Sequence, residues 1–170
     1  MVDYPPLAQA DDLVDFPGAP FPQSVVTAAG EAVRAAAGWH IAPAVTETLR
    51  IDSDGATLLL LPTGRLTAVA EVRDVTGDAP SIITGWRVSH RLGGLHRGTG
   101  WPCGFEAVEV DVVHGYTECP PDLLKIVAAE AGRRVAQQSA GPFSVSYADD
   151  ASSRESLTAR LWPYRLGPRP

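Results

Sequence analysis

The chain has no stretch of apolar residues near the roughly 18 that a membrane-crossing helix needs, which argues against a membrane protein. Its first residues carry acids and prolines, where a secretory signal would have a basic and then an apolar run. Only two cysteines occur in 170 residues, so we expect reduced thiols and synthesis in a cytoplasm. Positive charge is scarce too: 14 Lys and Arg against 20 Asp and Glu give a net charge of −6, which argues against a simple nucleic-acid binder.

Motifs of common catalytic and metal sites are also missing. The serines lack a GxSxG elbow, the cysteines and histidines lack CxxC or HxxxH pairs, and the glycines at 93–100 precede no expected helix. Cys103, His114 and Cys119 flank one expected strand, which leaves a metal- or ligand-binding β module as an alternative reading. The sequence therefore predicts no catalytic residue, no bound metal and no cofactor, and the chain is not expected to be an enzyme.

What the chain does contain is a strand, a corner and a long helix between residues 105 and 138. Valines at 108, 110 and 112 alternate with acidic residues, which is the period of a half-buried strand. Gly115 permits a sharp bend, and the prolines at 120 and 121 suit the start of a helix. An apolar stripe then recurs at three- and four-residue spacing at Leu124, Val127, Ala128, Ala131 and Val135. The rest of the chain is organised around this unit.

The flanking regions predict an α+β protein. An alanine-rich stretch over 23–37 has helical periodicity and ends at a glycine, and a short helix is expected near 153–162. Between the first helix and the central one, alternating runs and turn residues predict a meander of about five strands, one of them over 82–89, followed by a glycine-rich loop at 93–104. We expect one domain over residues 1–170, with a helical core of antiparallel helices, an inserted antiparallel β-sheet and an extended C-terminal arm. Its segments are N-terminal helices at 10–38, the β insertion at 43–114, the core helix at 120–139 and the strand, short helix and arm at 143–170. Pro163 is expected to end the short helix, so that Tyr164 begins an extended tail.

Charge is distributed unevenly, with acids near the start and arginines near the end. The last stretch combines Arg160 and Arg165 with Trp162 and Tyr164. These residue types occur in nucleic-acid patches and are also enriched at protein interfaces. Because the rest of the chain is acidic, we favour a protein interface.

Three stretches together resemble the head–tail connector (head-completion adaptor) family of tailed bacteriophages, in particular longer actinophage-type members with an inserted β region. They are Asp11-Asp12-Leu13 with the alanine-rich helix from Ser24, VEVDVVHGYTECPPDLLKIVAAEAGRRV, and the ending VSYADDASSRESLTARLWPYRLG. The resemblance covers nearly the whole chain in order. It departs from the family at His114, where threonine is frequent, and at Pro163, which interrupts the last helix.

The resemblance implies a structural virion protein in the neck, between head and tail. In that family the chain forms a ring, expected to be a dodecamer, that docks beneath the portal protein and receives stopper or tail proteins. The genomic DNA passes through the lumen without specific binding, and no membrane is involved. A tail-side neck protein of the same virion is the alternative.

Two sets of residues are predicted to make these contacts. We expect Arg160, Trp162, Tyr164 and Arg165 to face the portal, and Lys125, Arg133 and Arg134 on the exposed side of the central helix to contact the neighbouring subunit. For the second set, a solvated helix face is the competing interpretation.

Overall fold

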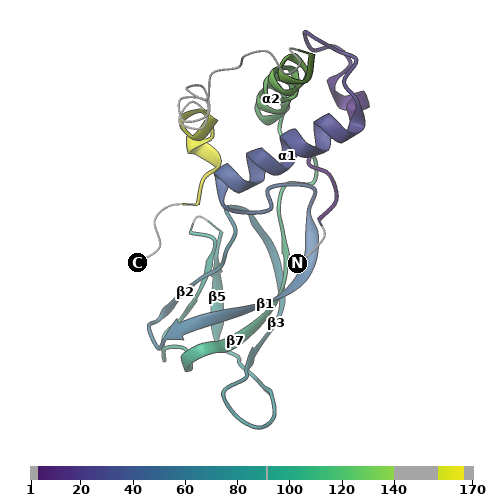
Figure 1. Cartoon of the computed structure of the whole chain (residues 1–170). Helices are drawn as coiled ribbons and strands as arrows, with labels where there is room; N and C mark the ends of the chain where they lie inside the picture. The colour runs from purple at the N-terminus through teal and green to yellow at the C-terminus, as the bar shows by residue number, and fades with distance from the viewer. Residues whose placement is uncertain (1–3, 91, 140–156, 167–170) are drawn as a thin grey trace. The chain divides into compact units, whose positions relative to one another are not determined.

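The computed structural model describes residues 4–90, 92–139 and 157–166, and the fold is α+β, as predicted. The described residues form two compact units (Figure 1). We call residues 4–43 and 117–166 the helical unit and residues 44–116 the β unit. The expectation of one domain with a β insertion stays a prediction.

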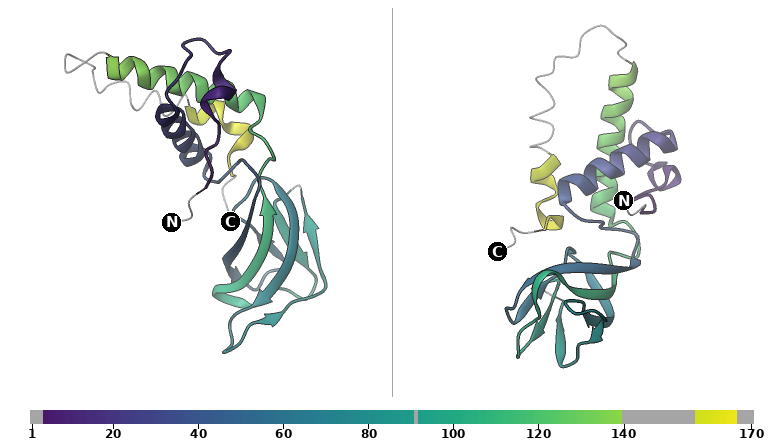
Figure 2. Two further views of the ribbon diagram at one scale, coloured as in Figure 1. Left: turned by 90° about the vertical axis from the view of Figure 1, so that its right-hand side faces the viewer. Right: turned by 60° about the horizontal axis from the view of Figure 1, so that its bottom comes forward.

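The helical unit contains η1 (Ala10–Leu13), α1 (Gln23–Ala37), α2 (Pro121–Ser139), a helical turn at 157–160 and η2 (Trp162–Tyr164). Helix α1 ends at Gly38, whose φ of 81° is the left-handed conformation that glycine adopts readily. Helices α1 and α2 contact one another and cross, instead of lying side by side along their lengths (Figure 2). The antiparallel packing that the sequence predicts is therefore not shown by this pair.

The buried face of α2 is turned slightly from the predicted stripe. Leu124 and Val135, both predicted to lie on it, are only half-buried. The positions that are buried are Leu123, Ile126, Val127, Ala128 and Ala131. Periodicity alone does not distinguish two adjacent leucines, because either one can begin the same three- and four-residue repeat.

Gly30, in the middle of α1, has a packing role that its sequence context hides. A Cβ at this position would lie 3.1 Å from the Cβ of Leu7, a fully packed side chain of the N-terminal segment. The glycine therefore lets that segment approach the helix closely, at the usual cost of a glycine in a helix interior.

The β unit consists of two antiparallel sheets. One has the order β1-β7-β3-β4 and the other β2-β6-β5. The strands are β1 (Val45–Asp54), β2 (Leu58–Leu60), β3 (Leu66–Asp74), β4 (Ser81–Ile82), β5 (Trp86–Ser89), β6 (Gly94–Arg97) and β7 (Cys103–His114). Both sheets contribute to one core, in which Val108, Val110 and Val112 of β7 are fully buried together with Leu59 and Leu95.

The strand pattern corrects the predicted meander in two places. The run expected as one strand over 82–89 is divided at Gly85, whose φ is 77°, and its halves join different sheets as β4 and β5. The glycine-rich stretch predicted to be a loop contains β6, where Gly94 faces Leu60 of β2. A Cβ at Gly94 would lie 2.5 Å from the carbonyl oxygen of Leu59, so glycine is required for this close pairing.

Within the described residues, no helix has the length and apolar character needed to cross a membrane.

Candidate interaction surfaces

The C-terminal segment at 157–166 folds onto the end of α1. Leu161 is completely buried. The indole Nε1–H of Trp39 donates to the carbonyl oxygen of Tyr164 at 2.5 Å, and the Leu166 N–H donates to the carbonyl oxygen of Ala37 at 3.2 Å. One buried leucine and two hydrogen bonds thus attach this segment to the helical unit (Figure 1).

This attachment corrects the expectation that Tyr164 begins an extended tail. Tyr164 ends η2, its carbonyl oxygen accepts from Trp39, and its side chain is half-buried. Arg160, Trp162 and Arg165 are exposed, with Trp162 at 74%. The structure therefore places three of the four predicted portal contacts on the surface of one short, attached segment. Their contact with a portal stays a prediction.

The second predicted contact set, on α2, is engaged in ion pairs along its own helix. Lys125 lies 3.3 Å from Asp122. Arg133 and Arg134 both bind Glu130, at 2.6 Å and 3.1 Å, and both are about one-third exposed. The exposed pair of Lys125 with Asp122 contributes only about 0.3–0.5 kcal/mol, so it can rearrange when another surface binds, whereas the pairs of Glu130, which is only 10% exposed, are half-buried. The ring contact is not tested by this geometry.

Arg34 is a structural centre that sequence reasoning missed. Its side chain, only 7% exposed, donates to the carbonyl oxygens of Pro5, His40 and Ala42 and pairs with Glu31 at 3.0 Å. Burial lowers the pKa of its guanidinium, and Glu31 partly offsets that effect. Arg34 thus joins the N-terminal segment and the 40–42 turn to α1. No local motif marks this role, because the acceptors are backbone oxygens from separate segments.

The alternative metal site is not assembled. Cys103 and His114 lie at opposite ends of β7, opposite Asp54 and Val45 of β1, and the nine steps of about 3.3 Å between those partners separate them by roughly 30 Å. His114 is buried with its Nε2 2.6 Å from Glu47, and both cysteines are free. Burial and the negative charge of Asp12 raise the pKa of the Cys119 thiol to about 12, which disfavours the thiolate that zinc requires. These three residues cannot share one ion.

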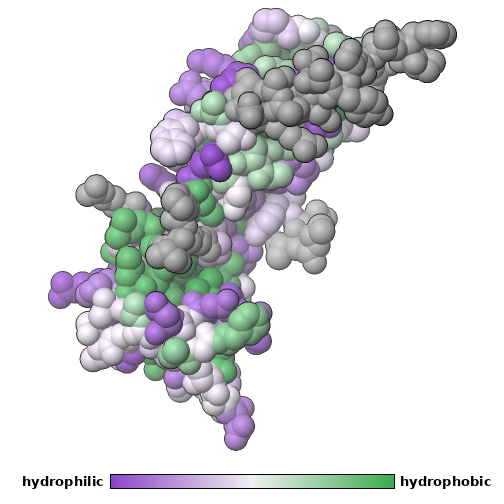
Figure 3. Space-filling view, turned by 60° about the vertical axis from the view of Figure 1, so that its left-hand side comes forward, coloured by the Kyte–Doolittle hydropathy of each residue, from purple (hydrophilic) through white to green (hydrophobic). Residues whose placement is uncertain are grey.

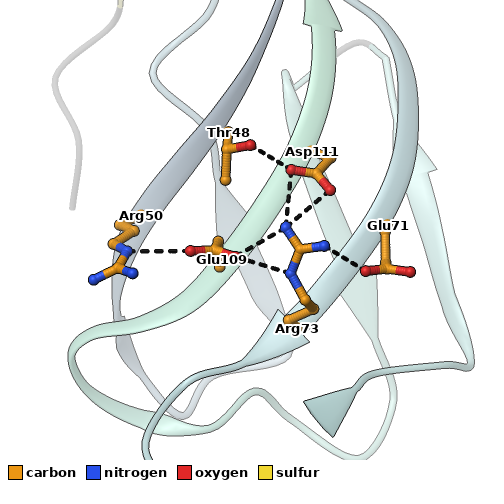
Figure 4. Close-up of polar contacts among 6 residues, drawn as sticks. All are labelled: Thr48, Arg50, Glu71, Arg73, Glu109 and Asp111. Atoms are coloured by element: carbon orange, nitrogen blue, oxygen red, sulfur yellow. Dashed lines mark hydrogen bonds and ion pairs between the residues drawn. The ribbon is translucent and has the colours of Figure 1, made fainter. Parts of the chain in front are cut away.

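A charged network covers the face of the β1-β7-β3-β4 sheet opposite its core (Figure 4). Arg73 of β3 pairs with Glu71, with Glu109 at 2.8 Å and with Asp111 at 2.9 Å. Arg50 of β1 pairs with Glu109 from the other side, at 3.2 Å. Hydrogen bonds to these carboxylates raise the pKa of Arg73. Because three carboxylates surround its guanidinium, Arg73 links β3 to β7 by ion pairs and is not available to bind an anion.

No family model matches the chain, and no curated protein matches it in sequence. Its fold is shared by solved structures. A chain from the neck of an empty GTA particle, computed with C6 symmetry, aligns with a TM-score of 0.62 at 19% identity, over 94% of this chain and 88% of that chain. A chain from the neck of a native GTA particle, computed with C12 symmetry, aligns with a TM-score of 0.56 at 21% identity, over 87% and 83%.

A third similar chain comes from the virion of a native gene transfer agent (GTA) particle. It aligns with a TM-score of 0.56 at 20% identity, over 87% of this chain and 78% of that chain. At such identities the likeness establishes the fold, and it extends over 87–94% of this chain and 78–88% of the other chains.

Proposed function

We propose that this chain is a structural subunit of a virion neck, where it forms a ring adaptor between the portal and the stopper or tail of a tailed phage or a phage-like particle. The observation that carries this proposal is the fold shared with neck chains of a GTA particle over 94% and 87% of this chain. The two neck structures were computed with C6 and C12 symmetry, which supports a ring, in this proposal a dodecamer.

The portal contact in this proposal is the attached C-terminal segment. Trp162 is a large exposed aromatic side chain flanked by the exposed Arg160 and Arg165. Tryptophan and arginine dominate binding energy at protein interfaces, and a segment already fixed to its own subunit loses little entropy on docking. Tyr164 takes part through its half-buried ring and through the carbonyl group that holds the segment in place.

The ring contact in this proposal includes Lys125, Arg133 and Arg134 on α2. In a closed ring each subunit uses two different surfaces, one for each neighbour. A neighbouring carboxylate surface would compete with Asp122 for Lys125 at low cost, because that pair is exposed and weak, and would add to the contacts that Arg133 and Arg134 make with Glu130.

The remaining features are consistent with a passive conduit. The net charge of −6 disfavours adhesion of a polyanion, which suits a channel through which genomic DNA moves without specific binding. The proposed role is structural and involves no catalytic residue or cofactor. It places the protein in the virion neck after its synthesis in the host cytoplasm.

Sedimentation of the purified chain, alone and mixed with the portal ring encoded in the same genome, tests the proposal. We expect co-sedimentation in a many-to-one complex, and we expect Trp162→Ala to weaken it at least tenfold. Ile82→Ala, which truncates a side chain of similar exposure in the β unit, is the matched control. Binding to tail components with no affinity for the portal would identify a tail-side neck protein instead.

A further inference from the structure

The β unit has an open seam, which we define as the gap between β1 and β2. Among the strands that the structure describes, each is the outermost strand of its sheet, and residues of both line the same groove. A groove of about 940 Å³ follows this gap, lined by residues of both strands and by the beginning of β7. Apolar surface is visible on the β unit beside hydrophilic side chains (Figure 3).

Burial shows that the seam is incompletely covered. Leu49 and Ile51 of β1 point to the same face of the sheet as Val108 and Val110, their partners on β7. The two valines are fully buried, whereas Leu49 and Ile51 are only half-buried. The apolar core therefore reaches the surface along β1, and an additional strand there would bury it.

A bulge at the end of the seam places Phe105 on the surface. Ile51 faces Val108 and Ser53 faces Gly104, so Asp52 alone stands opposite three residues of β7. Glu106 has a φ of 47°, unusual for a residue with a side chain, and its N–H donates to the Asp52 carboxylate at 2.7 Å. This pinned bulge leaves Phe105 83% exposed. Bulges of this kind redirect side chains at functional positions, and backbone strain of this kind gathers at binding sites.

The surroundings of the groove are acidic. Asp52, Asp54 and Glu106 line it and are exposed. Arg50 is the one cation among the lining residues, and it pairs with Glu109 at 3.2 Å and with Glu106 at 4.0 Å. The groove is therefore lined by exposed apolar side chains at Leu58 and Phe105 and by an excess of carboxylates.

We propose that the seam accepts an extended segment of a partner protein, which adds to the free edge of β1 as a further strand. Alternate residues of an antiparallel edge strand direct their backbone N–H and C=O groups away from the paired neighbour, so about half of the ten residues of β1 can pair with such a strand, and long free edges are natural templates for pairing. Apolar side chains on alternate residues of the segment cover Ile51, Leu58 and Phe105. Lysine or arginine at its ends meets Asp52, Asp54 and Glu106. This assignment goes beyond the neck role and does not require it.

Binding of short labelled peptides to the full chain tests the proposal. The probe is fluorescein-labelled Lys-Val-Thr-Val-Thr-Val-Lys. Its acidic twin has glutamate at both ends, and its proline twin has proline in place of both threonines. We expect fluorescence anisotropy to show at least tenfold tighter binding of the basic peptide than of either twin, because the acidic ends are repelled and proline cannot donate to β1. Hydrogen exchange should show new protection of amides in β1.

Point variants distinguish peptide binding at the seam from nonspecific binding elsewhere on the chain. Phe105→Ser should weaken the basic peptide at least tenfold, and Glu106→Gln should weaken it severalfold. Ile82→Ser, which changes an apolar side chain 66% exposed on β4, should leave it within twofold. Equal binding of the three peptides, protection outside β1, or no saturable binding would overturn the proposal. Self-association of the chain that Phe105→Ser abolishes would also overturn it, in favour of a second copy as occupant.

Discussion

Substitution of Leu161 by alanine tests whether the C-terminal segment is held by the contacts described above. Leu161 is completely buried, although it lies between Arg160 and the 74%-exposed Trp162. Removing a fully buried leucine side chain to the Cβ costs about 2–5 kcal/mol, depending on how far the site collapses. The hydrogen bond from Trp39 to the Tyr164 carbonyl, worth about 1 kcal/mol, is too weak to hold the segment alone.

Urea titration of the full chain, followed by far-ultraviolet circular dichroism, measures this effect. With a denaturant slope of about 2 kcal/mol per molar urea, a loss of 2–5 kcal/mol lowers the midpoint of the helical transition by roughly 1–2.5 M. Trp39 emission should change at the same urea concentration, because its indole contacts the attached segment.

Trp162→Ala provides the control, since it changes an exposed neighbour in the same segment. We expect its free energy of unfolding to stay within about 0.5 kcal/mol of that of the parent chain, while its binding to the portal falls. Leu161→Ala should lose both stability and binding. If Leu161→Ala unfolds at the parent's urea concentration, the segment is not anchored by this side chain and the reasoning fails.

Three further predictions concern the interior of each unit. Arg34→Met should destabilise the helical unit by about 2–5 kcal/mol in urea titrations, because two buried carbonyl oxygens and one half-buried carbonyl oxygen lose a charged donor. Arg87→Met, at an exposed position, should be neutral, and equal urea midpoints of the two variants would contradict the role of Arg34. Burial raises the pKa of Cys119 from 9.0 to about 12, so its contribution to stability is complete below pH 9. Between pH 9 and 12 only the thiol of the unfolded chain ionises, and the free energy of unfolding falls by up to about 1.4 kcal/mol per pH unit. Cys119→Ala should flatten this alkaline decline and Cys103→Ala should not; identical slopes in the two variants would count against it. Gly94→Ala should lower the free energy of unfolding by about 1–3 kcal/mol in thermal denaturation, because its Cβ would meet the Leu59 carbonyl. Gly98→Ala, with open space around the glycine, should be tolerated. If both variants are tolerated, β2 and β6 separate easily and the close pairing is not required.

Local patterns in the sequence were sufficient to locate the two long helices. The alanine-rich stretch ending at Gly38 is α1, and the apolar repeat following Pro120 is α2. The alternation of valine with acidic residues likewise matches β7, whose valines are buried and whose Glu109 and Asp111 lie on the opposite face. Each of these features depends on neighbours within one or two turns, or on the two-residue period of a strand.

The division of the strands between two sheets was beyond the reach of local patterns. The sequence around Gly94 is typical of a loop, but in the fold this glycine belongs to β6 and allows β2 to approach closely. Asp52 and Asp54 look like part of a turn and instead belong to β1, where one of them holds the bulge that exposes Phe105. Strand partners are chosen by segments far away in the chain, so no window of sequence contains the information.

By itself, the sequence determined the α+β class, the positions of the long helices and the acidic balance of the chain. It also resembled a phage neck protein, and neck chains of a GTA particle share the fold of this chain. Tertiary structure alone decided that Arg34 is buried against three carbonyl oxygens, that Leu161 anchors the segment carrying Trp162, and that β1 and β2 leave a seam between two sheets. The physical reason is the same in each case. Helix and strand propensities act between residues near in sequence, whereas burial and pairing are settled by which distant segments meet.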